Sequence, residues 1–291
     1  MVAFVLTIAF TVAIYWLFRA FKGWGLSTSS WAITINYFVA ALFGWSLAGG
    51  PEAMNQTLDA PWLPVVVIMG LCFYPLFQLT ARCTQTLGVS VASIATKLSM
   101  AIPVIVFVLF DGMGSSHPGQ WAGVALAFPA VVLASASGED TGRPWWKSLH
   151  WMPFVMFAGS GCIDLVFGWH AMDPMLAQEG MRFAFASVPF TLGGMVGLLH
   201  AVWNQTPIPS WKDLMGGLAL GLVNFGSLYV LLLAYDAMLM DRAMVVPVLN
   251  LSVIVVATIG GMWIFGDRLD RQALWGVALA TASIGLMMLF A

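Results

Sequence analysis

The sequence predicts an all-α integral membrane protein with ten transmembrane helices, arranged as two inverted five-helix repeats. Three observations predict this class: the composition, ten apolar runs of membrane-spanning length, and a match between the two halves of the chain. Hydrophobic residues make up 60% of the 291 residues and charged residues only 8%, with a mean hydropathy of +0.90. A soluble domain has roughly 25% charged residues. The chain therefore belongs in a lipid bilayer.

The ten apolar runs give the expected helices in order. A bilayer core about 30 Å thick requires about 20 helical residues at 1.5 Å each. Runs of this kind cover 2–21, 30–48, 61–81, 88–110, 118–136, 152–172, 181–201, 212–234, 241–265 and 271–290. No positive charge precedes the first run, as it would in a secretory signal, so we expect this run to be a retained span.

A repeat is visible when the chain is aligned with itself at an offset of 153 residues. This offset places GVALA at 123–127 on GVALA at 276–280 and, without a gap, aligns Ser99 with Ser252. The most polar connection, 137–150, falls near the middle of the chain. We therefore divide the chain into a first repeat at 1–137, a central loop at 138–150 and a second repeat at 151–291.

The odd number of spans in each half predicts that the second copy enters the membrane the other way up. Secondary transporters of this architecture bind their substrates near the bilayer midplane, between the repeats. Basic residues in loops favour the cytoplasmic side. One side has eight of them and the other two (Arg19, Lys22, Arg82, Arg143, Lys147, Lys212, Arg268 and Arg271 against Arg182 and Arg242). This count places both termini outside the cytoplasm, in a cell membrane of the bacterial inner-membrane kind.

Two passages resemble the drug/metabolite transporter superfamily, specifically its EamA-type branch. They are LGVSVASIATKLSMAIPVIVFVLFDG at 87–112 and MDRAMVVPVLNLSVIVVATIGGMWIFGDRLDRQALWGVALATASIGL at 240–286. Gly266 and Asp267 stand where that family often has glycine and glutamate. The resemblance implies a ten-helix metabolite transporter. It also implies termini in the cytoplasm, against the loop charges, so the orientation stays open.

Lys97 is the first candidate for a transport residue. An ionised side chain inside a span costs roughly 2.5 to 3.5 kcal/mol on insertion scales unless it meets water or a polar partner. Ser90, Ser93 and Lys97 share one helical stripe, and Pro103 cannot donate to the Ser99 carbonyl, which predicts a free acceptor nearby. The alternative is that Lys97 snorkels or forms a purely structural pair.

Asp164 is the corresponding acid in the sixth span, with Ser160, Gly161 and Gly168 on the same helix face. We expect it to pair with Lys97 across the two halves, where a substrate or a proton could compete for the pair. A static salt bridge would place the two residues in the same way. The spacing alone leaves both interpretations open.

Three amides in spans are further candidates: Asn36, Asn224 and Asn250. Asn250 occupies the position that the offset of 153 relates to Lys97. Intramembrane amides also join helices by hydrogen bonds that contribute about 0.6 kcal/mol, and this alternative holds for each of them.

Tyr37, Gln78 and Trp169 are weaker candidates. Aromatic residues near helix ends often belong to the interfacial belt, and a lone glutamine can simply bridge backbone groups. The GxxxG pairs at 193–197 and 217–221 favour close helix packing, either within a monomer or between the monomers of a homodimer.

Together these features favour a secondary transporter that works by alternating access on a small polar or amphipathic metabolite. Lys97 facing a carboxylate and Asp164 facing an ammonium or a proton suit an amino-acid-like solute. We expect no cofactor, no metal and no nucleic-acid partner, because the net charge is only −2 and no cysteine or histidine set has ligand spacing. The alternatives are a membrane scaffold or receptor, or an intramembrane enzyme using Ser160 and His170; we expect no enzyme.

Overall fold

The computed structural model describes residues 2–26, 30–110, 117–136, 149–170, 173–236, 242–267 and 270–290. Of these residues 88% are helical, and none lies in a strand. Most of the predicted central loop, with Arg143 and Lys147, lies outside the described residues, as does Arg268. The Arg242 side chain is also outside them.

Within the described ranges, ten helical segments are long and apolar enough to cross a bilayer, as the sequence predicts. They are built from α1 (Val2–Gly23), α2 (Ser30–Ala48), α4 (Leu63–Leu87), α5 (Val89–Leu98) with α6 (Ala101–Phe110), α7 (Pro118–Ser135), α8 (Met152–His170), α9 (Glu179–Trp203), α10 (Trp211–Asp236), α11 (Arg242–Phe265) and α12 (Arg271–Leu289). Two short helices, α3 (Pro51–Leu58) and η2 (Pro174–Ala177), connect spans. The protein is a multi-pass membrane protein.

The chain forms two compact units, and each unit takes segments from both halves of the sequence. Unit 1 comprises Met1–Ala20, Leu79–Asp164 and Ser227–Ala291. Unit 2 comprises Phe21–Gln78 and Leu165–Gly226. The compact units therefore do not coincide with the two sequence repeats.

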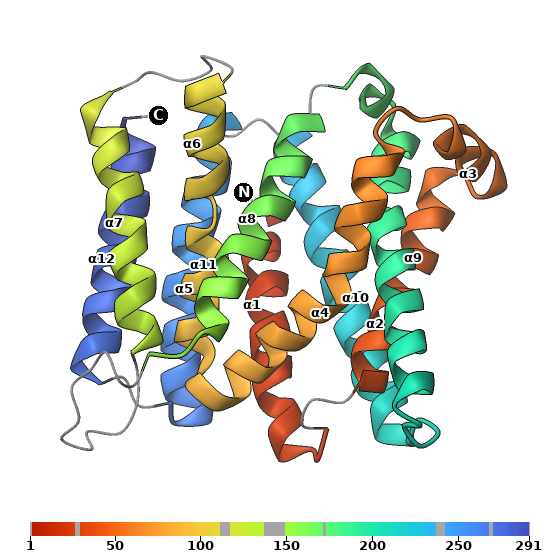
Figure 1. Ribbon diagram of the computed structural model, residues 1–291, viewed down its shortest axis with the longest axis horizontal. Coiled ribbons are helices and arrows are strands. Elements are labelled where there is room, and N and C mark those ends of the chain that lie inside the picture. The colour runs from red at the N-terminus through yellow and green to blue at the C-terminus, as the bar shows by residue number, and fades with distance from the viewer. Residues whose placement is uncertain are drawn as a thin grey trace. The chain divides into compact units, whose positions relative to one another are not determined.

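In unit 1, α7 packs along the length of α12 (Figure 1). Glycines permit this contact from both sides. A Cβ on Gly123 would lie 2.7 Å from the Ser283 carbonyl oxygen, and a Cβ on Gly276 would lie 3.0 Å from the Ala134 amide nitrogen. The Ser283 hydroxyl also donates to the Gly123 carbonyl at 2.7 Å. Small residues thus allow the two backbones to approach closely.

The fourth span is not one continuous helix, because α5 ends at Leu98 and α6 begins at Ala101. The Ile102 amide donates to the Ser99 carbonyl at 2.9 Å in a tight turn, and regular bonding resumes with Val104 donating to Met100. Pro103 has no N–H for the Ser99 carbonyl, so the chain closes this turn one residue earlier. The expectation of a free Ser99 carbonyl was therefore wrong.

In unit 2, α2 packs along α9, while α3 and η2 cover part of α9. A Cβ on Gly193 would lie 3.3 Å from the Tyr37 ring, and a Cβ on Gly221 would lie 2.9 Å from the Asn36 carbonyl. Both GxxxG pairs therefore serve contacts within the chain. They leave the choice between monomer and homodimer open.

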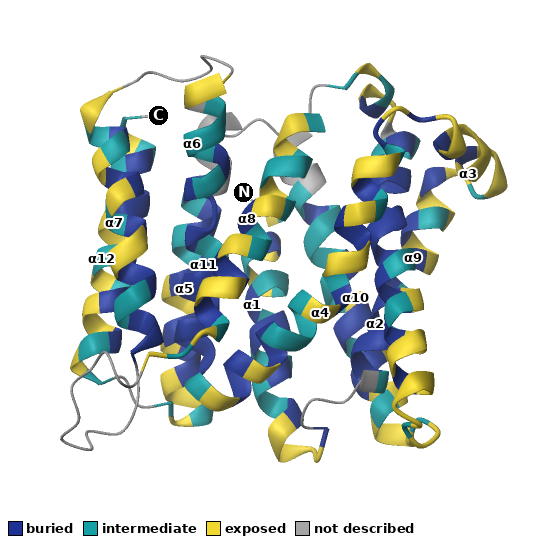
Figure 2. Cartoon of the chain, in the orientation of Figure 1, coloured by how far each residue is buried: buried dark blue, intermediate teal, exposed yellow. Residues whose placement is uncertain are grey.

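The pattern of burial is that of a protein in a bilayer, with apolar side chains on the outer surface, and not that of a protein in water. Exposed residues occur on many helices (yellow in Figure 2). Many of them are large and apolar, among them Leu42, Ile68 and Leu199 at 67%, 66% and 68%. Residues 89–95 of α5, by contrast, are buried without exception, including Ser90 and Ser93. The helix that carries Lys97 is thus enclosed by protein over most of its length.

Candidate functional site

Lys97 lies in the last turn of α5 and is half-buried. A cation is favoured there, because the carbonyl end of a helix carries partial negative charge. The Asn250 side-chain amide, from α11, donates to the Lys97 carbonyl oxygen at 3.3 Å and lies 3.3 Å from the Met100 sulfur. The interruption after α5 frees this carbonyl, and Asn250 satisfies it. The two positions that the sequence repeat relates are therefore in direct contact.

Asp164 projects from α8 and is exposed. Its Oδ2 lies 2.9 Å from the Ser99 hydroxyl oxygen, which is also 2.6 Å from the Thr96 carbonyl oxygen. One turn earlier on α8, Gly161 leaves room for Ile102 of α6. The acid of the sixth span is thus tied to the break in the fourth span.

Lys97 and Asp164 lie close enough for their charges to interact. Within the described residues, however, no direct ion pair joins them, and the direct partner of Asp164 is Ser99. The predicted direct pair between Lys97 and Asp164 is therefore not formed among the described residues. This arrangement leaves both charged groups able to interact with a third group.

Two residues that the sequence analysis did not single out belong to this cluster. The Tyr15 hydroxyl of α1 hydrogen-bonds the Thr96 hydroxyl, in the position just before Lys97. Thr96 also donates to the Ala92 carbonyl at 2.9 Å. A phenol in the middle of the apolar first span was the signal in the sequence that could have identified Tyr15. Ser93, in contrast, is fully buried and donates to the Ser90 carbonyl at 3.0 Å.

Unit 2 contains a separate, uncharged polar cluster. The side-chain amides of Asn36 and Asn224 are joined by a 3.1 Å hydrogen bond between α2 and α10. The Tyr37 hydroxyl donates to the Phe73 carbonyl at 2.8 Å, and its ring packs 5.4 Å from that of Phe77. Asn36 and Tyr37 are almost completely buried, at 0% and 1% exposed. They hold α2, α4 and α10 together.

A short relay of polar side chains joins α4 and α9. The Gln78 amide donates to the Tyr74 hydroxyl at 2.7 Å, and that hydroxyl lies 3.2 Å from Nδ1 of His200. Trp169 is 54% exposed near the end of α8, as an interfacial aromatic residue would be. The candidate residues fall into two groups. Unit 2 contains Gln78, Trp169, Asn36, Tyr37 and Asn224, and unit 1 contains Lys97, Asp164, Asn250 and Ser93.

The side chains of these clusters are suited to hydrogen bonding rather than to metal binding. No group of three or more histidine, cysteine or acidic residues suited to a metal occurs in the described part of the chain. The unit 1 cluster offers one cation, one carboxylate, hydroxyls and an amide at the broken span. Such a set can hold a small molecule by both of its charged ends.

Comparisons with known proteins leave the family of this chain unassigned. No family model matches. An uncharacterized protein of Haemophilus influenzae is 24% identical over 260 residues, covering 87% of this chain and 86% of that protein. A protein of known crystal structure is similar over 100% of this chain and 99% of its own, with a TM-score of 0.57 and 14% identity. That likeness concerns the fold alone.

Proposed function

We propose that this protein is a secondary transporter that moves a small polar or amphipathic metabolite across a cell membrane by alternating access. The observation that carries the proposal is the exposed carboxylate of Asp164 beside Lys97, within membrane-spanning segments and at the break between α5 and α6. Charged groups inside a bilayer are costly and mark substrate or ion pathways. An exposed carboxylate at this depth requires water or a polar ligand rather than lipid.

The arrangement of the cluster favours an amino-acid-like solute. The Lys97 ammonium has no hydrogen-bonded partner among the described residues, so it is available for a carboxylate. Asp164 is held by one hydroxyl, which leaves acceptor positions for an ammonium or a proton. A solute with both charges would satisfy the two groups together.

Symmetry of the packing supports an inverted duplication. Gly123 meets residues 283 and 287, and Gly276 meets 130 and 134, which are the same pairs exchanged at the offset of 153. The same offset relates two further contacts in unit 2, Gly44 with Ser187 and Gly197 with Thr34. Exchange of partners in this way is what a two-fold relation between repeats produces. It supports the ten-helix, EamA-type drug/metabolite transporter architecture that the sequence suggested.

The proposed setting is a bacterial inner membrane, with extracytoplasmic termini favoured by the loop charges. Of the basic residues on the proposed cytoplasmic side, Arg19, Lys22, Arg82, Lys212 and Arg271 lie in the described ranges. No enzymatic step is proposed, and the proposed partners are the solute, the lipid bilayer and, as a coupling ion, the proton. An impermeant thiol reagent applied to each side of vesicles, with a cysteine placed at Asp59 or Lys212, tests the orientation.

The test of the function is uptake and counterflow in proteoliposomes with a panel of amino acids and related metabolites. Lys97→Met and Asp164→Asn remove one charge each with little change in size. Asp59→Asn is the matched control, because Asp59 is an exposed acid outside the spans. We expect at least a tenfold loss of solute-specific flux in the two site variants and wild-type flux in the control.

Two outcomes would contradict the proposal. Equal flux in Lys97→Met, Asp164→Asn and the wild type would remove these residues from the pathway. A folded wild-type protein that neither transports nor binds any solute of the panel would favour the alternative of a membrane scaffold or receptor. Turnover of a solute into a new compound would instead favour the intramembrane enzyme.

A further inference from the structure

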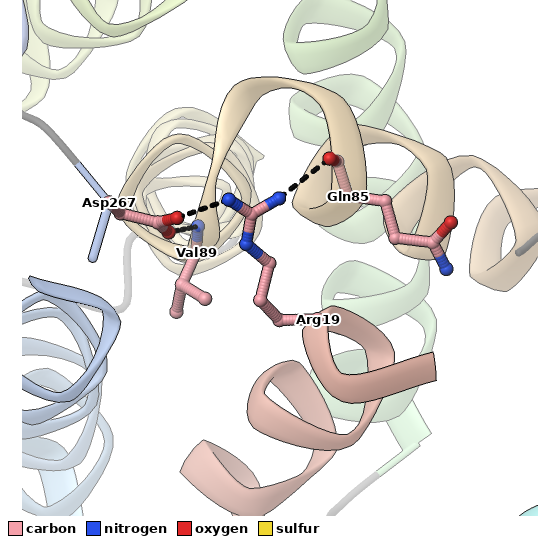
Figure 3. Close-up of polar contacts among 4 residues, drawn as sticks. All are labelled: Arg19, Gln85, Val89 and Asp267. Atoms are coloured by element: carbon pink, nitrogen blue, oxygen red, sulfur yellow. Dashed lines mark hydrogen bonds and ion pairs between the residues drawn. The ribbon is translucent and has the colours of Figure 1, made fainter. Parts of the chain in front are cut away.

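The helix that carries Lys97 begins without a cap from its own segment. Gly88 precedes α5 with a φ of +98° and offers no side-chain hydrogen bond to the first turn. Such a start leaves backbone N–H groups unsatisfied. Here the carboxylate of Asp267, just after α11, accepts a hydrogen bond from the Val89 amide at 3.0 Å (Figure 3). A residue far away in the sequence thus performs the role of an N-cap.

Gly88 makes this approach possible. The Asp267 Oδ2 atom lies 3.1 Å from the point where a Cβ on Gly88 would be, which is closer than ordinary contact. The positive φ of Gly88 is also a conformation that other residues adopt at a cost. Asp267 is itself fixed, because its amide donates to the Gly261 carbonyl at 3.1 Å.

Arg19 of α1 completes the arrangement. Its guanidinium pairs with the second carboxylate oxygen of Asp267 and donates to the Gln85 carbonyl, at the end of α4, at 2.7 Å. Figure 3 shows the guanidinium between these two acceptors. The side chains are only 20% and 7% exposed, so solvent screens the ion pair little.

The far end of α5 is held by the same segment. Asn250 of α11 donates to the Lys97 carbonyl, so α11 and the residues after it satisfy both ends of α5. Tyr15, one helical turn before Arg19 on α1, hydrogen-bonds Thr96. A short helix with both ends fixed has little freedom to shift along its axis or rotate.

We propose that Asp267 is a positioning residue of the transport site, which acts by capping the start of α5 and so fixes the place of Lys97 at its end, with Arg19 in a lesser, supporting role. That a fixed position of Lys97 matters for transport rests on the proposed function. The coupling between the two ends of α5 is a property of the protein alone. It can be measured without any substrate.

The chain itself supplies a reporter, because it has only four lysines: Lys22, Lys97, Lys147 and Lys212. Brief acetylation of the full-length protein in nanodiscs with acetic anhydride, read by mass spectrometry, gives the reactivity of Lys97 relative to Lys212. Hydrogen exchange of the α5 peptide is measured in parallel. Exchange of the α7 and α12 peptides is the internal control for general unfolding.

Four variants separate the cap from the ion pair. Asp267→Ala removes both interactions, and we expect about a fivefold rise in the relative Lys97 reactivity and in α5 exchange, the size expected for a lost N-cap. Asp267→Asn keeps an acceptor for the Val89 amide, and Arg19→Gln leaves Asp267 in place, so each should change both readouts by about twofold or less. The exchanged pair Arg19→Asp with Asp267→Arg restores the charges but not the acceptor, so it should behave as Asp267→Ala does.

The proposal is overturned if Asp267→Ala leaves Lys97 and α5 unchanged, if the exchanged pair restores wild-type values, or if α7 and α12 exchange rises equally. If Asp267→Ala does not fold, the exchanged pair is compared with Asp267→Asn instead. A larger rise in Lys97 reactivity and α5 exchange in the exchanged pair supports the proposal, and equal values overturn it. With a transported solute, Asp267→Ala should raise KM more than it lowers kcat. If no solute is transported while the Lys97 reactivity still shifts, the proposed function fails and the coupling stands.

Discussion

Two pairs of spans in unit 1 are aligned by the same offset of 153, yet the two members of one pair are much more alike than those of the other. The α7 and α12 pair keeps the segment GVALA in both copies, and Gly123 and Gly276 make equivalent contacts. In the other pair, α5 and α6 are interrupted while α11 is continuous, and Lys97 faces Asn250. Both pairs pack together in the same unit.

The difference has a physical reason. Lys97 and Asn250, which the offset of 153 aligns, are in direct contact. A small residue can occupy both aligned positions, because Gly123 and Gly276 each only let the backbone of the neighbouring helix come closer. A second lysine at position 250 would bring a like charge to the same end of α5, in a medium of low dielectric constant. Packing positions aligned by the offset can therefore be identical, whereas a charged position is expected to differ between the two halves.

The largest effect is expected from exchanging the two unlike residues. In the double variant Lys97→Asn with Asn250→Lys, the charge moves to a continuous helix and the amide that satisfies the carbonyl of residue 97 is lost. We expect at least a tenfold loss of counterflow, similar to that of Lys97→Met alone. Wild-type flux in the exchanged protein would mean that the two positions are interchangeable and that the break in the fourth span is unimportant.

The next effect concerns the pair that has stayed alike. Gly123→Ala would place a Cβ 2.7 Å from the Ser283 carbonyl, and Gly276→Ala would place one 3.0 Å from the Ala134 amide. Each should lower the free energy of unfolding in mixed micelles by about 1 to 3 kcal/mol.

Gly285 provides the matched control for this pair, because a Cβ there meets nothing within 4 Å. Gly285→Ala on the same helix α12 should leave stability unchanged or raise it by up to about 1 kcal/mol. If Gly123→Ala lowers the free energy of unfolding no more than Gly285→Ala does, the close approach of α7 and α12 does not require these glycines.

A smaller effect is expected from Asn250→Leu. The change leaves the Lys97 carbonyl without its donor while keeping a side chain of similar size. Hydrogen bonds between membrane helices contribute about 0.6 kcal/mol on average, so we expect a loss of about 0.5 to 1.5 kcal/mol in the same unfolding measurement. Asn224→Leu, which breaks an amide pair in unit 2, gives the comparison, and equal losses at both sites would mean that Asn250 serves packing alone.

The smallest effect should follow from Pro103→Ala. The new amide could donate to the Ser99 carbonyl, which now accepts from Ile102. We expect a gain of at most about 1 kcal/mol in stability and slower hydrogen exchange across residues 99–104, since the fourth span becomes more regular. Unchanged exchange would show that Asn250 and Asp164, rather than the proline, maintain the break.

The candidate site was predicted only in part. The sequence identified Lys97, Asp164 and Asn250, because each is costly or unusual inside an apolar run. It suggested a direct pair between Lys97 and Asp164, whereas the structure gives Asp164 the Ser99 hydroxyl as its direct partner. Asn36 and Tyr37 were equally visible as polar residues, yet they are buried helix-to-helix contacts in unit 2.

The sequence by itself determined the ten spans, because apolar length is a one-dimensional property set by the thickness of the bilayer. The sequence also predicted a duplication, since the match at an offset of 153 needs no coordinates to be seen. Only the tertiary structure decided which groups satisfy the backbone at the two ends of α5. Asp267 and Asn250 do so from more than 150 positions away, and no local pattern records a hydrogen bond that forms only after the helices have packed.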